Sequence, residues 1–254
     1  MLKNVRAHLW HKGFWDAIIL YRLIFGAKTC FISRMHTLIR SRVYICLELA
    51  IIAFAIPVLM IGHIERGAIF TALWIMALYC GFIYRRLLPG ITITQVWDGA
   101  ALRDWSLWKP ILKRFALSAI AMTALVFAVN PEKFLELPTE RTLLWCMVMV
   151  FYPAISVIPQ EFIIRSFFME RYKLLFAGKW PMIAASAVTF GFAHIVLQNW
   201  IAVALTAVGG YYFASTYHKR PSMALVWAEH ALYGCFVFTI GLGFYFYSGA
   251  PHKW

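Results

Sequence analysis

Long apolar runs separated by short polar segments make up most of the chain. Each run predicts a membrane-spanning helix, because a helix needs about 20 predominantly apolar residues to cross the hydrocarbon core of a bilayer. Several runs are shorter than that, so we expect their ends to shift by a few residues. The runs cover about residues 43–62, 68–84, 115–130, 143–164, 181–197, 200–217 and 222–247. The pattern therefore predicts an all-α, polytopic integral membrane bundle of about seven transmembrane helices.

The composition excludes the other common classes of protein. Hydrophobic residues make up 62% of the chain and charged residues 14%, whereas a soluble domain has about 45–50% and about 25%. A water-soluble fold could not hide so much apolar surface, and a disordered chain would lack it. The five cysteines are scattered and odd in number, which excludes a disulfide-stapled secreted module. We interpret them as small packing residues.

The charge balance predicts how the chain is oriented in the membrane. There are 24 Lys and Arg against 11 Asp and Glu, which gives a formal net charge of +13. Such an excess sets topology and lies against anionic lipid, so we expect the lipid bilayer as a partner and no nucleic acid. We predict a cytoplasmic N-terminus, in the cell inner membrane if the source is bacterial. If the spans alternate in direction, only four of the 24 basic residues lie on the outer side, namely Arg66, Lys133, Arg141 and Lys253.

The chain divides into a basic start and one membrane domain. Residues 1–42 are expected to be a basic cytoplasmic or interfacial segment without a cleavable signal peptide. Within them, Phe14–Ala27 is apolar but interrupted by charges, which is typical of an amphipathic helix lying on the inner membrane surface. Residues 43–254 form the predicted transmembrane domain, and the polar site is expected within 143–247.

Six ionisable residues fall inside predicted spans, and five of them lie in the second half of the chain. A charged side chain at the bilayer centre costs roughly 2.5–3.5 kcal/mol, so such residues usually face a polar interior. The sixth, Glu48, lies in the first half of the chain, away in sequence from the other five, and is interpreted as a packing or proton-sensitive residue. The other five are Glu161, Arg165, His194, Glu229 and His230.

The first polar group is the segment QEFIIR. Glu161 and Arg165 are four residues apart, so they share a helix face and are expected to pair in lipid. Pro153 and Pro159 precede them, and each frees a carbonyl one turn earlier and tends to kink the helix. A kinked span that admits water beside a carboxylate would be a reactive cavity.

The other two polar groups are FGFAH, which ends at His194, and HALYG, which begins at His230. A lone His in an apolar span is commonly a hydrogen-bonded structural residue. Glu229 points about 100° away from His230 on a helix, so it need not face the same cavity and is expected to pair elsewhere, for example near Lys219 or Arg220. Together, the three groups put Glu, Arg and two His on three spans of one half of the protein.

In this order, QEFIIR, FGFAH and HALYG resemble the signatures of the CPBP family, which includes CAAX prenyl endopeptidases and bacteriocin-processing or abortive-infection membrane proteases. The family pattern is two adjacent Glu and a following Arg, then FxxxH, then HxxxN or a variant. By position, Glu161 matches the second Glu, Arg165 the Arg, His194 the His of FxxxH and His230 the His of the third motif. The resemblance covers about residues 150–245 and implies an intramembrane endopeptidase.

Two positions depart from the family pattern. Gln160 occupies the place of the first Glu, which is usually assigned as the base that activates water. Gly234 occupies the place of the Asn that helps to bind the developing oxyanion. A Gln cannot act as a base, although its amide can orient water or donate a hydrogen bond.

Amide hydrolysis needs a base, donors for the oxyanion and an acid for the leaving amine. We therefore predict that Glu161 is the carboxylate base, held in place and ionised by Arg165. His194 would orient water or shuttle a proton, and His230 would stabilise the oxyanion. Glu229 is the backup carboxylate. The expected substrate is a membrane-associated peptide or protein, and no cofactor is expected.

Three alternatives stay open. Glu161, His194 and His230 could instead form a His₂Glu set for zinc with an open position, giving metal-assisted hydrolysis. The departures at Gln160 and Gly234 favour a membrane scaffold or binding protein that keeps the fold without hydrolysis. Intramembrane carboxylates and histidines also build proton- or ion-coupled transporters, although the sequence lacks the internal inverted repeat of common transporter designs.

Overall fold

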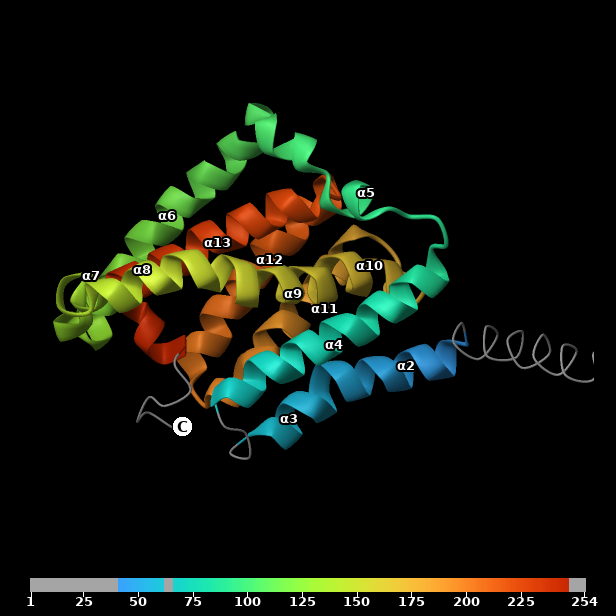
Figure 1. Ribbon diagram of the computed structural model, residues 1–254, viewed down its shortest axis with the longest axis horizontal. Coiled ribbons are helices and arrows are strands. Elements are labelled where there is room, and N and C mark those ends of the chain that lie inside the picture. Colours follow the sequence, from blue (N-terminus) through green and yellow to red (C-terminus); the bar gives the residue numbers. More distant parts are fainter. Residues whose placement is uncertain (1–40, 62–65, 247–254) are drawn as a thin grey trace, which may run out of the picture. The chain divides into compact units, whose positions relative to one another are not determined.

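The structure is a computed structural model that describes residues 41–61 and 66–246. Across these residues the chain forms helices joined by short turns, and no strand is present among them (Figure 1). The all-α prediction is therefore confirmed. The predicted interfacial helix at Phe14–Ala27 lies outside the described residues.

The helices follow one another in a simple order, with several interrupted by 3₁₀ or π turns. The first half comprises α2 (Arg42–Ala50), η1 (Ile51–Ala55), α3 (Ile56–Met60), α4 (Arg66–Leu87), α5 (Ile93–Trp97), η2 (Gly99–Arg103), α6 (Trp105–Val129), η3 (Pro131–Lys133) and α7 (Glu136–Glu140). The second half comprises α8 (Thr142–Phe151), η4 (Tyr152–Val157), α9 (Ile158–Glu161), η5 (Phe162–Phe167), α10 (Phe168–Arg171), α11 (Lys179–Ala193), η6 (His194–Leu197), α12 (Trp200–Lys219), α13 (Met223–Ile240) and η7 (Leu242–Phe246).

The chain forms two compact units, Met1–Glu48 and Leu49–Trp254. Of the first unit, the structure describes Ser41 and the start of α2, which includes the buried Glu48. The second unit contains all the candidate site residues. The architecture below is that of the second unit.

Within the described ranges, six helical segments are long and apolar enough to cross a membrane. They agree with six of the seven predicted runs, so the chain has the helices of a polytopic membrane bundle. The remaining run lies in α12, which is long enough but less apolar because it carries two adjacent glycines and several hydroxyl-bearing residues. A count of seven is thus not confirmed by length and composition. The six segments are Arg42–Met60, Ala68–Leu87, Trp105–Val129, Thr142–Arg171, Lys179–Leu197 and Met223–Ile240.

The side-chain contacts at the two ends of α12 nevertheless show that this helix crosses the second unit. At one end, the Asn199 side chain caps the start of α12 and donates to the carbonyl of Tyr245, beyond the end of α13, at 2.6 Å. At the other end, Arg220 forms an ion pair with Asp98, between α5 and η2, at 2.8 Å. Since α12 runs from Asn199 to Arg220, it reaches from one end of the bundle to the other (Figure 1).

The third span begins earlier than the sequence predicts. We expected it at residue 115, but α6 begins at Trp105, because the basic residues of its first turns hide the helical pattern. Asp104 caps this helix by accepting hydrogen bonds from the Ser106 hydroxyl at 2.6 Å and the Ser106 backbone N–H at 2.9 Å. These two bonds hold the pKa of Asp104 below its usual value.

Helix α13 is the most deeply packed span. Apart from Glu229, His230 and Thr239 it is apolar on all sides, as expected for a helix surrounded by others. Of its span, 56% is buried, against 39% or less for the other five spans. It packs against α6, α12 and η4 (Figure 1). It ends at Ile240 because Gly241 adopts a left-handed φ of 103°, and the predicted end at 247 is therefore too late.

The span Thr142–Arg171 is irregular where the prolines predict it. Pro159 has no N–H, so the carbonyl of Ile155, four residues earlier, lacks its α-helical partner. The Trp74 indole N–H donates to that carbonyl at 2.9 Å, and the Trp227 indole donates to the carbonyl of Pro153 at 2.8 Å. The π turns η4 and η5 lie on either side of Glu161, and such turns are frequent at functional sites.

Candidate functional site

Glu161 and Arg165 form a buried ion pair on successive turns of one span. Arg165 Nε lies 3.2 Å from Glu161 Oε2, and neither side chain is exposed. Arg165 Nη1 also donates to Ser186 Oγ in α11 at 2.9 Å. The guanidinium lies 5.1 Å from the ring centre of Phe190 and 5.8 Å from that of Phe213. The pairing predicted from the four-residue spacing is present, and aromatic faces supply further stabilisation of the buried cation.

The other carboxylate oxygen joins Glu161 to His230. His230 Nδ1 lies 2.8 Å from Glu161 Oε1, and His230 is 6% exposed. Because a carboxylate only accepts hydrogen bonds, Nδ1–H is the donor, and a neutral imidazole then carries its lone pair on Nε2. The first and third motifs therefore meet directly, through α9 and α13.

Phe190 connects the second motif to this pair. Its ring meets the ring of His194 edge-on at 4.9 Å and that of His230 at 5.4 Å between centres. His194 Nδ1 donates to the Phe190 carbonyl at 2.8 Å, which leaves the lone pair on Nε2. Phe213 stacks on the ring of His230, with ring centres 4.7 Å apart and an angle of 21° between the ring planes. The two imidazoles thus contact the same aromatic ring.

The predicted runs 143–164 and 181–197 would place Glu161 and His194 at different depths, because each residue lies near the end of its run and the two runs cross the membrane in opposite directions. The helix continues to Arg171, so Glu161 lies well inside the membrane segment. At the other motif, the α-helix ends at Ala193 and a 3₁₀ turn begins with His194. The contacts of Phe190 with both imidazoles, and the bond between His230 and Glu161, place His194 and Glu161 in the same region of the bundle.

Tyr152 completes the polar contacts of His230, and the sequence did not single it out. Its hydroxyl oxygen lies 3.0 Å from His230 Nε2. Since Nε2 carries the lone pair, the phenol is the donor. Tyr152 lies well inside its span and belongs to none of the three motifs, so no pattern in the sequence distinguishes it. Its position as the first residue of η4, before Pro153, is the only local signal.

Gln160 lies beside the pair in sequence but is bonded elsewhere. Its amide nitrogen donates to Ser156 Oγ, one turn earlier on the same span, at 2.7 Å. The side chain is half-buried. In this position Gln160 helps to fasten the irregular turn, and its role in orienting water stays a prediction.

Glu229 belongs to a separate cluster of polar side chains. Its Oε1 lies 2.5 Å from Arg114 Nη2, and the Thr216 hydroxyl donates to Oε2 at 2.6 Å. Arg114 also donates to Thr216. The expected partner near Lys219 or Arg220 is therefore wrong, because helix α6 begins early and brings Arg114 within reach. The structure does not bring Glu229 into the Glu161–His230 contacts.

Replacing Arg114 by Met is expected to destabilise the protein by about 3 kcal/mol, because it leaves the carboxylate of Glu229 buried without its cation. Thermal unfolding in detergent measures the change. Lys113→Met, at an exposed position one residue earlier, is the matched control and should unfold like the wild type. Adding Glu229→Gln to Arg114→Met should recover part of the loss, and no recovery would show that the ion pair is not its cause.

The metal-assisted alternative requires Glu161, His194 and His230 to surround one ion. Over the part of the chain that the structure describes, no group of three His, Cys, Asp or Glu side chains is arranged to hold a metal. Glu161 and His230 bond to each other instead. The geometry therefore supports a carboxylate–imidazole pair.

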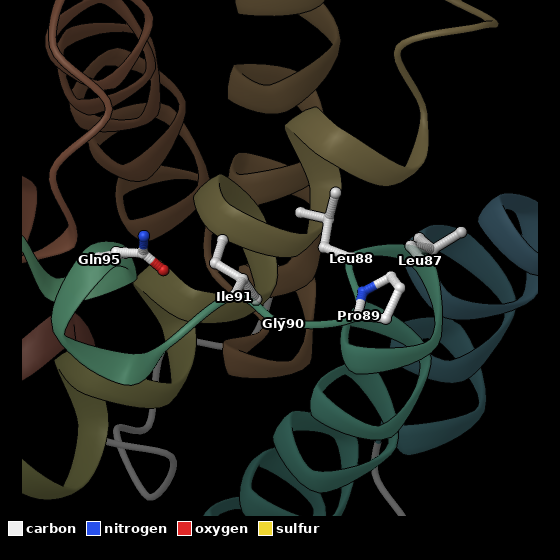
Figure 2. A pocket seen from close by; sticks show the side chains of 6 residues that line it. All are labelled: Leu87, Leu88, Pro89, Gly90, Ile91 and Gln95. Carbon is white, nitrogen blue, oxygen red and sulfur yellow. The ribbon is translucent and has the colours of Figure 1, made fainter.

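A surface pocket of about 460 Å³ lies away from these residues, along the segment that leads from α4 into α5. Figure 2 shows its lining, which is apolar except for one amide: Leu87, Leu88, Pro89, Gly90, Ile91 and Gln95. None of the predicted site residues lines it.

Comparison with known proteins also draws attention to the part of the chain that holds the three motifs. A family model described as Rce1-like, type II CAAX prenyl endopeptidase Rce1-like, matches residues 141–236. No curated protein and no solved structure matches the chain. The matched range contains all three motifs and supports membership of the CPBP/CAAX protease family. At the level of the family, it suggests a CAAX-type endopeptidase within an integral membrane protein.

Proposed function

We propose that this chain, as a member of the CPBP/CAAX protease family, cleaves peptide bonds within the membrane and that the Glu161–His230 pair is its reacting centre. The contact between Glu161 Oε1 and His230 Nδ1 at 2.8 Å carries the proposal. A carboxylate that holds one imidazole nitrogen makes the other nitrogen a proton acceptor, which is the arrangement that hydrolytic enzymes use to activate a hydroxyl group.

The roles of Glu161 and His230 follow from which atoms are occupied. Both oxygens of Glu161 are engaged, one by Arg165 and one by His230, and the side chain is not exposed. His230 Nε2 instead accepts a hydrogen bond from the Tyr152 hydroxyl, a single neutral donor that a water molecule can displace. We assign His230 Nε2 as the base and Glu161 as the group that fixes its tautomer and stabilises the imidazolium. This assignment replaces the one predicted from sequence, in which Glu161 takes the proton from water.

Arg165 and His194 support this centre from two sides. Arg165 balances the charge of Glu161 and is itself fixed by Ser186. His194 contacts the ring of Phe190, which also contacts His230, and its Nε2 carries a lone pair. We propose that His194 binds water or relays a proton to the leaving amine, as the sequence predicts, and that no cofactor takes part.

We propose a cytoplasmic N-terminus as well. The end of the bundle that carries Arg220 also carries the basic residues Arg103 and Lys219. The opposite end, at residues 130–141, carries three glutamates and two basic residues. Basic residues accumulate on the cytoplasmic side of membrane proteins. The substrate would then be a membrane-associated peptide or protein.

Comparison of membranes from cells that make the wild-type protein or Glu161→Gln tests the proposed function. Proteomic mapping of new protein N-termini should find cleavage products with the wild type that are absent with the variant. Peptides spanning those sites, with and without a prenyl group, then identify the substrate class. Identical sets of N-termini from the two membranes, at equal protein levels, would favour the alternative of a scaffold or binding protein.

A further inference from the structure

Gly234 lies one turn after His230 on α13, and the space beside it is filled by the phenol of Tyr152. A Cβ atom at position 234 would collide with the Tyr152 hydroxyl and ring, with Cζ only 2.5 Å away. Real Cβ contacts are essentially never that short. The tyrosine can therefore occupy this place only because residue 234 has no side chain.

The same hydroxyl is directed at the reacting centre. Its oxygen lies 3.0 Å from His230 Nε2, the nitrogen that bears the lone pair because Nδ1–H is given to Glu161. Phe238, one turn after Gly234, contacts the ring edge-on at 5.2 Å between centres and keeps it in this direction. The result is a continuous line of hydrogen bonds from Glu161 through His230 to Tyr152.

We propose that Tyr152 is a catalytic residue whose phenol O–H binds the oxyanion formed during hydrolysis, and that Gly234 provides the space it needs. In the pattern that the third motif resembles, an Asn occupies position 234, so a side-chain donor stands one turn after the His. Here a donor from a different span, at the start of η4, occupies that volume. The inference rests on the proposed function and explains why the departure at Gly234 need not abolish it.

The geometry suggests how the hydroxyl changes partners. When the substrate carbonyl enters, the O–H bond turns from His230 Nε2 toward the carbonyl oxygen and frees the lone pair for a water molecule. Nε2 takes a proton from that water, the water oxygen forms a bond to the carbonyl carbon, and the π electrons move to the carbonyl oxygen. The new Nε2–H can then donate to the Tyr152 oxygen, while the phenol O–H donates to the oxyanion.

The second half of the step returns each group to its starting state. The oxyanion electrons re-form the C=O bond, the C–N bond breaks, and the proton on Nε2 passes to the leaving amine. The products are a carboxylic acid and an amine, and His230 is again neutral. Tyr152 never gives up its proton, so its contribution is a hydrogen bond made in the transition state.

Three variants test the inference against a peptide that the wild-type protein cleaves. Tyr152→Phe keeps the ring and removes the donor, so kcat should fall by about 10²–10³-fold with KM little changed. Gly234→Ala should lower both kcat and the unfolding temperature, because it displaces the phenol. In a Tyr152→Ala background, Gly234→Ala should no longer lower the unfolding temperature. Tyr211→Phe, on an exposed ring, is the matched control.

A fourth variant tests whether a different side chain can replace the hydrogen-bond donor that Tyr152 supplies. Gly234→Asn combined with Tyr152→Ala places an amide where the phenol stood, and its kcat should exceed that of Tyr152→Ala alone. Full kcat in Tyr152→Phe, beside a Glu161→Gln variant that is inactive, would overturn the inference and leave the proposed function standing. Full activity in both variants, or no cleavage by the wild type, would overturn both.

Discussion

Glu161→Gln is expected to lower kcat by about 10⁴-fold, the loss seen when the carboxylate of a Ser–His–Asp triad becomes an amide. The amide preserves the size of the side chain, but its NH₂ group can face His230 Nδ1 and favour the wrong tautomer. It also cannot balance the imidazolium that forms when Nε2 takes a proton. Turnover in proteoliposomes measures the effect, and circular dichroism checks that the helices remain.

Glu170→Gln is the matched control for this change. Glu170 lies on the same long span, in α10, and pairs with Lys173 near the end of the helix, where the lysine is largely exposed. An exposed pair of this kind contributes little to stability, so kcat should equal that of the wild type. A Glu161→Gln protein that is folded and cleaves at the wild-type rate would remove Glu161 from the reaction.

His230→Asn should be inactive to a similar degree, with a loss of at least about 10³-fold in kcat. The Asn amide nitrogen can stand where Nδ1 stands and still donate to Glu161, but the variant has no nitrogen in place of Nε2. The hydrogen bond between residue 230 and Glu161 is thus kept, while the proton-accepting nitrogen is removed. This substitution separates a chemical role of His230 from a role in packing.

The exposed His218, in the last turn of α12, offers the matched His→Asn control and should leave turnover unchanged. If Glu161 and His230 act as one unit, the double variant Glu161→Gln/His230→Asn should be little worse than either single variant, because residues of a catalytic unit are not additive. Substantial turnover in His230→Asn would mean that another group activates water.

The sequence predicted the features that depend on local pattern. Hydropathy located six spans, and the four-residue spacing predicted the ion pair between Glu161 and Arg165 that the structure contains. The meeting of three motifs on different spans followed from the cost of leaving charges alone in lipid, combined with the family resemblance. These inferences need no knowledge of how the helices are rotated against one another.

The features that the sequence missed depend on how the helices are rotated against one another and on irregular turns within them. Arg114 falls just before the third predicted run, which was expected to begin at residue 115, because three basic residues in the first turns of α6 hide a helix that begins at Trp105. Glu229 could be assigned a partner only once α6, α12 and α13 were in place. Tyr152 reaches His230 through a π turn, and such turns are set by packing. Gly234 looked like a loss of function in the sequence, whereas in the structure it makes room for a phenol.

The central claim is that a pair of buried side chains from two spans activates water to break a peptide bond. Cleavage of one identified substrate in water enriched in ¹⁸O, by the wild type and by Glu161→Gln in parallel, tests it most directly. We expect the wild type to place ¹⁸O in the new carboxyl terminus and the variant to form no product above the level without enzyme. Labelled product from Glu161→Gln at the wild-type rate would contradict the account.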